Sequence, residues 1–92
     1  MKATIEVEQK ADLNFLVRVR EPGGESIHHV TLKRKDYDKL TDGKAEPEDL
    51  IKRSFEFLLE REPKESILAR FDLSVIGRYF PEYESEMRRG LK

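Results

Sequence analysis

The segment between Pro47 and Tyr83 most constrains the fold, because it holds most of the large apolar residues of the chain. In its first part, apolar residues recur three or four positions apart, at Leu50, Ile51, Phe55, Leu58 and Leu59. This spacing is typical of one face of an amphipathic helix. Pro47 suits the first turn of that helix, since its missing N–H has no partner there. The pattern therefore predicts a long helix that begins at Pro47.

Prolines divide the rest of this segment. We expect the long helix to end before Pro63, because a residue that precedes proline resists the helical conformation. A second helix is predicted to begin at Pro63, and a third after Asp72, whose carboxylate can accept hydrogen bonds from the first turn. Pro81 ends the third helix. The predicted buried face of the second helix consists of Ile67, Leu68 and Phe71.

The N-terminal third of the chain predicts β-structure instead. Apolar and polar residues alternate over residues 3–8, 13–20 and 26–33, and a period of two is typical of half-buried strands. The run Glu21-Pro22-Gly23-Gly24 indicates a turn between the second and third strands. The three strands form an antiparallel meander with one apolar face, which needs a cover. We expect the helices from Pro47 onward to supply that cover.

Side-chain matching predicts the register of both hairpins, because a slip of one residue moves every apolar side chain to the other face. In the second hairpin, a four-residue loop places Phe15 opposite Val30 and Val17 opposite His28. In the first hairpin, we expect Ile5 to lie opposite Phe15. Both pairings gather the large apolar residues on one face of the sheet.

The sequence therefore predicts an α+β fold in a single domain of residues 1–92. A three-stranded antiparallel β-meander is followed by a short helix over residues 35–40, the long helix and two shorter C-terminal helices (βββαααα). Residues 88–92 are predicted to be a frayed tail. The predicted core consists of Phe15, Val17, Val30, Leu32, Phe55, Leu58, Leu59, Leu68, Phe71 and Ile76.

Composition narrows the chemistry that the chain can perform. It has no cysteine, which excludes disulfides, thiolate catalysis and cysteine-based metal sites. Its 18 basic and 19 acidic residues give a net charge of −1, which argues against affinity for nucleic acid driven by the phosphate backbone. The N-terminus lacks the apolar region of a signal peptide, and no apolar run approaches the ~20 residues that span a bilayer. We expect a cytoplasmic protein with no membrane contact.

No catalytic, metal-binding or nucleotide-binding motif stands out. His28 and His29 are adjacent, so on a strand they face opposite sides and cannot easily bind one metal ion. The alternative is that His29 forms a pH-sensitive surface cluster with Arg18 or Glu6. No pair of carboxylates is placed to flank a cleft. We therefore expect a protein that is not an enzyme and that binds no cofactor and no metal.

A late group of aromatic and sulfur-containing side chains is the first candidate for function. It has two interpretations, core packing or a surface for a partner or for self-association, since Tyr, Phe and Met are enriched at interfaces. The candidate partner-contact residues are Tyr79, Phe80, Tyr83 and Met87.

A group of basic residues is the second candidate. Arg18 and Arg20 are predicted to project from the outer face of the sheet, and a Lys-Arg-Lys run follows the third strand. The interpretations are a solvated charged face or a contact for RNA, DNA or an acidic partner, although that face lacks the aromatic residues on which bases stack. The candidate nucleic-acid contacts are Arg18, Arg20, Lys33, Arg34 and Lys35.

Residues 54–83, SFEFLLEREPKESILARFDLSVIGRYFPEY, resemble the C-terminal signature of a family of small uncharacterised bacterial proteins. The resemblance extends back to VTLKRKDYDKLTDG at residues 30–43. It implies a bacterial domain that covers most of the chain, and it implies no activity and no functional residues. A second, architectural resemblance is to HicB-type antitoxins, which also place three strands before a helix. The chain lacks their glycine-containing segment before that helix.

These observations lead to two functional hypotheses. The first is a non-enzymatic protein-interaction or self-associating module, with an unknown protein or a second copy of the chain as its partner. The alternative is an antitoxin-like or nucleic-acid-binding regulator that uses the basic residues.

Overall fold

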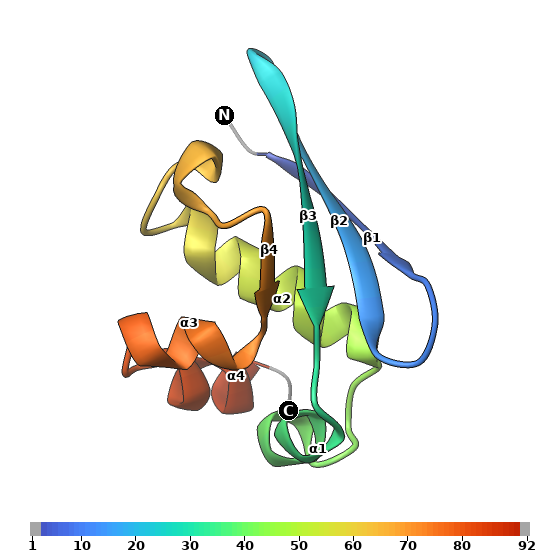
Figure 1. Ribbon diagram of the computed structural model, residues 1–92. Helices are drawn as coiled ribbons and strands as arrows, with labels where there is room; N and C mark the ends of the chain where they lie inside the picture. Colours follow the sequence, from blue (N-terminus) through green and yellow to red (C-terminus); the bar gives the residue numbers. More distant parts are fainter. Residues whose placement is uncertain (1–2, 91–92) are drawn as a thin grey trace.

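In the computed structural model, which describes residues 3–90, a mixed β-sheet lies against a layer of helices (Figure 1). The strands are β1 (Thr4–Gln9), β2 (Asn14–Glu21), β3 (Gly24–Thr31) and β4 (Arg70–Asp72), in that order across the sheet. The helices are α1 (Arg34–Thr41), α2 (Pro47–Leu59), the short 3₁₀ turn η1 (Lys64–Ser66), α3 (Ser74–Tyr79) and α4 (Tyr83–Gly90).

The second hairpin has the predicted register. Phe15 lies opposite Val30 and Val17 opposite His28, in an antiparallel ladder that runs the full length of β2 and β3. All four side chains are buried, so the apolar face predicted from the alternation is the face that the helices cover. The antiparallel order of β1, β2 and β3 is as predicted, but these strands form only part of a larger sheet.

The first hairpin has a different register from the predicted one. Ile5 lies opposite Val19, not opposite Phe15, and Val7 lies opposite Val17. The physical reason is the longer ladder that this register allows, which also places Glu6 opposite Arg18 as an opposite-charge pair. The predicted register is shifted by four residues. Because this number is even, the apolar side chains stay on the predicted face.

The helix predicted to begin at Pro63 is absent, and this is the main correction to the fold. Its place is taken by η1 and by β4, which pairs with β3 in a parallel ladder. The N–H of His29 donates to the carbonyl of Ala69 (2.8 Å), and the N–H of Leu73 donates to the carbonyl of Thr31 (2.8 Å). A helix here would leave this edge of β3 without partners, so the three-stranded meander becomes a four-stranded mixed sheet.

The helices α2 and α3 begin close to the positions that the sequence signals indicate. Pro47 begins α2, and the side chains of Glu46 and Asp49 form a capping box at its first turn. Asp72 accepts hydrogen bonds from the N–H (3.1 Å) and hydroxyl (2.7 Å) of Ser74, at the start of α3. At the C-terminus α4 extends to Gly90, so residues 88–90 are helical and not the predicted frayed tail. Residues 91 and 92 lie outside the described part of the chain.

The core lies between the sheet and the helices, and eight of its ten predicted members are buried. The exceptions are Leu59, which is half-buried, and Leu68, whose side chain is 52% exposed because it does not lie on a helix face. His28 joins the core, with its ring 5.3 Å from that of Phe55. Its Nδ1 donates to the carbonyl of Leu68 (2.7 Å), and its Nε2 lies 2.8 Å from the hydroxyl of Ser26.

Candidate interaction groove

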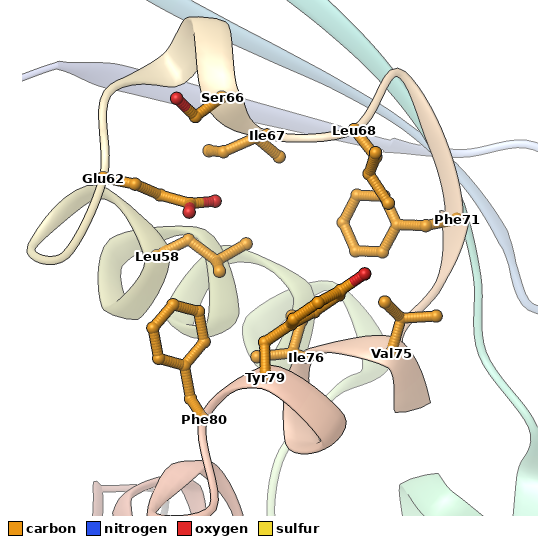
Figure 2. Close-up of a pocket in the computed structure, with 10 residues that line it drawn as sticks. All are labelled: Leu58, Glu62, Ser66, Ile67, Leu68, Phe71, Val75, Ile76, Tyr79 and Phe80. Atoms are coloured by element: carbon orange, nitrogen blue, oxygen red, sulfur yellow. The ribbon is translucent and has the colours of Figure 1, made fainter.

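An open apolar groove of about 370 Å³ lies beside β4, with α3 and η1 forming two of its walls (Figure 2). We call this surface the groove. Its lining residues are Leu58, Glu62, Ser66, Ile67, Leu68, Phe71, Val75, Ile76, Tyr79 and Phe80.

Local interactions outside the groove hold its walls in place. The ammonium group of Lys64 in η1 lies 3.1 Å from the carboxylate of Glu21 in β2, which ties η1 to the sheet. The ladder to β3 fixes β4, and the carboxylate of Asp72 fixes the start of α3. The floor consists of buried side chains, among them Leu58 and Ile76. The groove is therefore a formed feature of the fold and needs no rearrangement to open.

Two large apolar side chains of the groove are much more exposed to solvent than the core residues are. Tyr79 is 71% exposed and Leu68 is 52% exposed. In Figure 2 the Tyr79 ring extends across the groove and its hydroxyl lies on the side of Phe71 and Val75. Exposed large apolar side chains that line one groove mark a binding site more often than scattered single residues do.

One carboxylate, that of Glu62, points into the groove (Figure 2). Its neighbours along the chain form ion pairs: Arg61 contacts Glu82 (3.1 Å), and Lys64 contacts Glu65. Glu62 itself forms no ion pair or side-chain hydrogen bond with any residue from 3 to 90. An apolar groove with one unpaired negative charge suits a ligand that is apolar and carries a positive charge.

The late aromatic cluster predicted from the sequence is divided by the structure. Tyr79 and Phe80 line the groove, whereas Tyr83 and Met87 are buried between α4 and α2. The Tyr83 hydroxyl lies 2.6 Å from the Oγ of Ser54, and burial raises the pKa of this phenol. Tyr83 and Met87 therefore attach α4 to the core, and their side chains cannot reach a partner.

Phe80 has a structural contact as well as a place in the groove. Its ring meets that of Phe57 edge-on, with 5.7 Å between the ring centroids. The guanidinium of Arg61 stacks on Phe57, 3.6 Å from its centroid, and also binds Glu82. These contacts fix the corner between α3 and α4, which leaves Tyr79 as the accessible aromatic residue of the predicted cluster.

The two arginines of the predicted basic group lie on the outer face of β2, as expected, but acidic residues surround them. Arg20 lies 2.9 Å from Glu25 and 3.3 Å from Glu6. Arg18 lies 3.7 Å from Glu25 and 4.0 Å from Glu6. This arrangement is a charge network with both signs, and it lacks the excess positive potential that phosphate contacts require.

The remaining basic residues lie at the other end of the sheet. Glu25 lies opposite Arg20, and Thr31, six residues further along β3, is about 20 Å away. Lys33 and Arg34 follow beyond it, each in an ion pair with an acidic residue. Lys35 is exposed on α1. The five predicted nucleic-acid contacts thus form two separate groups and not one patch.

His28 and His29 face opposite sides of β3, as the strand geometry predicts. His28 is buried and His29 is exposed. In the part of the chain that the structure describes, no group of three or more acidic or histidine side chains could hold a metal ion.

Sequence reasoning missed most of the groove, including Leu58, Glu62, Leu68 and Phe71 as parts of a surface site. A usable signal was present, because polar and apolar residues alternate from Arg70 to Leu73, as on a half-buried strand. That run is short, and the neighbouring prolines and apolar residues favoured a helix.

Comparison with known protein families, curated proteins and solved structures finds no match to this chain. The resemblances of residues 54–83 to a bacterial family and of the architecture to HicB-type antitoxins therefore stay predictions. Within residues 3–90, no helix combines the length and the apolar character needed to cross a membrane.

Proposed function

We propose that this chain is a non-enzymatic protein-interaction module and that the groove is its binding surface. The observation that carries this proposal is the exposure of Tyr79 and Leu68 beside a formed apolar groove. Leaving two large apolar side chains in water costs free energy that burial against a partner would recover. Tyrosine is also among the residues most enriched where proteins bind one another.

The titratable groups of the molecule support a binding role over a catalytic one. The pKa of Asp72 is lowered to about 2, and a backbone hydrogen bond and Arg61 lower the pKa of Glu82. A general acid needs a pKa raised toward neutrality, so neither carboxylate suits that task. The groove itself presents one carboxylate and no histidine.

The alternative, a nucleic-acid-binding or antitoxin-like regulator, has weaker support. Its candidate residues divide into two groups, and Glu6 and Glu25 neutralise Arg18 and Arg20. We therefore favour a protein partner, or a second copy of the chain, over a nucleic acid.

Site-specific photo-crosslinking tests the proposal. A benzophenone amino acid is placed at Tyr79 in the groove and, as a matched control, at Thr4, which is exposed on β1. In a bacterial cell extract we expect a saturable product from position 79 and none from position 4. An excess of wild-type chain without benzophenone should reduce the amount of that product, because it occupies the partner. The same excess of the Leu68→Asp variant should not reduce it.

The mass of the product separates the two kinds of partner. A product of twice the mass of the chain identifies self-association, and light scattering over a concentration series should then show a dimer. Any other mass identifies a different protein. Equal products from both positions, or products that the wild-type chain does not compete for, would contradict the proposal.

A further inference from the structure

The free edge of β4 lies next to the groove, and it indicates how a partner binds there. In a parallel ladder, alternate residues direct both backbone groups to the same neighbour. The hydrogen bonds from His29 to Ala69 and from Leu73 to Thr31 turn residues 69, 71 and 73 toward β3. The N–H and carbonyl groups of Arg70 and Asp72 therefore face away from β3.

No other strand or loop among residues 3–90 pairs with this edge. β4 is the last strand in the sheet order, and no backbone hydrogen bond within that part reaches the main chain of Arg70 or Asp72. A strand edge with free donors and acceptors is a template for an additional strand. Strands lie about 4.8 Å apart, so an added strand would extend the sheet on the side of β4 away from β3 (Figure 1), next to the groove residues Leu68 and Phe71.

We propose that the groove binds an extended peptide segment of a partner protein, which adds to β4 as a fifth strand. This inference rests on the proposed function and names the chemistry of the partner. Backbone hydrogen bonds to Arg70 and Asp72 hold the segment. An apolar side chain enters the groove between Leu68 and Tyr79, and a basic side chain on the same face pairs with Glu62.

The shape of the site selects an extended segment as its occupant. β4 has three residues, so the edge that can pair with another strand is about 10 Å long. The segment that contains η1 and the helix α3 flank the two ends of β4 (Figure 1). A single strand fits between them, whereas the edge of a second folded copy would bring its own helical layer against them.

Alternation along the added strand fixes the sequence pattern of the ligand. Side chains of residues i and i+2 share a face, whereas residue i+1 points to the other side of the sheet. The groove and Glu62 lie on the same side, together with the buried side chain of Phe71. The expected pattern is therefore an apolar residue, any residue, and then lysine or arginine, in either chain direction.

The test uses a terminally blocked peptide, Thr-Val-Thr-Leu-Thr-Arg-Thr, titrated into the isotope-labelled chain and followed by NMR. We expect shifts of the groove residues Ile67 and Val75, and slower hydrogen exchange of the Arg70 and Asp72 amides when the peptide is bound. A peptide with Glu in place of Arg should bind about tenfold more weakly, because it faces Glu62. Glu62→Lys should reverse this preference.

Two N-methylated peptides test the backbone hydrogen bonds and report the strand direction. If the segment is antiparallel to β4, methylation of the Thr amides removes binding and methylation of the Val, Leu and Arg amides does not. If it is parallel, the reverse holds, because the other set of residues faces β4. If both methylated peptides bind as well as the parent, strand addition is wrong and groove binding alone stands.

The variant Arg70→Pro removes an edge N–H without removing a donor from the β3 ladder. It should keep the thermal midpoint of the wild type and lose peptide binding, while the surface variant Lys35→Glu binds normally. If Arg70→Pro does not fold, the exchange rates of the wild-type amides decide the matter. Groove shifts without protection of Arg70 and Asp72 would overturn strand addition, and absence of all shifts would overturn the peptide ligand. Crosslinking at Tyr79 would still test the proposed function separately.

Discussion

The two edges of the sheet show how the same backbone chemistry is used in different ways. The β1 edge is six residues long, and its outer side chains include Glu6 and Glu8, both charged and exposed. Its inner side chains, Ile5 and Val7, pack against the core. Charged side chains on an edge strand discourage pairing with another chain. The β1 edge therefore resembles a protected edge.

The β4 edge is shorter, and apolar side chains next to it are exposed. Its inner side chain, Phe71, forms part of an open groove, and the adjacent Leu68 and Tyr79 are exposed. Length alone would make β1 the better template for pairing. A pocket also lies beside β1, but charged side chains such as Lys52 and Glu56 line it, whereas the lining beside β4 is mostly apolar. The lining next to an edge therefore decides whether strand addition gains apolar contacts as well as hydrogen bonds.

The largest effect is expected from removing the core support of the β4 side. Phe55 is fully buried, with its ring 5.3 Å from His28 and 6.1 Å from Phe71. Phe55→Ala should lower the free energy of unfolding by about 3–5 kcal/mol, measured by urea denaturation. Val7→Ala, at a half-buried position of β1, is the control and should cost about 1 kcal/mol. A similar loss in both variants would show that the two edges are supported equally.

A smaller loss of stability is expected at low pH, and we expect it to come from Asp72 in β4. Partial burial alone would raise the pKa of Asp72, but hydrogen bonds from Ser74, Thr31 and Lys33 outweigh it and lower this pKa to about 2. A lowered pKa contributes stability that is complete above the unfolded value of 3.8 and is lost as the pH falls through the folded value. The loss between about pH 4 and pH 2 should be of the order of 2 kcal/mol.

The variant Asp72→Asn checks the origin of this acid sensitivity. It should be less stable than the wild type at neutral pH, and its stability should vary less between pH 4 and pH 2. Val7→Ala, which changes no titratable group, is the control and should keep the pH dependence of the wild type. An unchanged slope in Asp72→Asn would assign the acid sensitivity to other groups.

The smallest change in stability is expected from substitution of Tyr79, although this residue should contribute most to binding in the groove. Tyr79 is 71% exposed, so Tyr79→Ala should change the free energy of unfolding by no more than about 0.5 kcal/mol. The same variant should lose peptide binding and should not compete for the crosslinked product, whereas Thr4→Ala on β1 should keep both properties. A large loss of stability in Tyr79→Ala would mean that the side chain supports the fold and is not available to bind a partner.

Local patterns in the sequence were sufficient for the β2–β3 hairpin and for α2. The alternation around Phe15 and Val17 fixes which side chains face the helices, and the turn after Glu21 sets the register. Pro47 and the capping residues beside it mark the start of α2. These elements are determined by interactions between residues that are close in the chain, so their signals survive without the rest of the fold.

The candidate site was predicted only in part, because its parts meet through long-range contacts. Tyr79 and Phe80 were named from the sequence, and both line the groove. Tyr83 and Met87 were named with them, but their side chains turn toward Ser54 in α2 and are buried. Helical spacing places residues on a face, but it does not say whether another element covers that face.

The amino-acid sequence alone determined the α+β class, the apolar face of the meander and the start of the long helix, because these follow from periodicity and end-capping over a few neighbouring residues. Only the tertiary structure decided that residues 70–72 form a strand. Val30 pairs with Phe71 across 41 positions of the chain. This pairing gives the backbone N–H and carbonyl groups at the edge of β3 their partners, and no pattern among neighbouring residues indicates it. The groove and the open edge of β4 follow from that one long-range pairing.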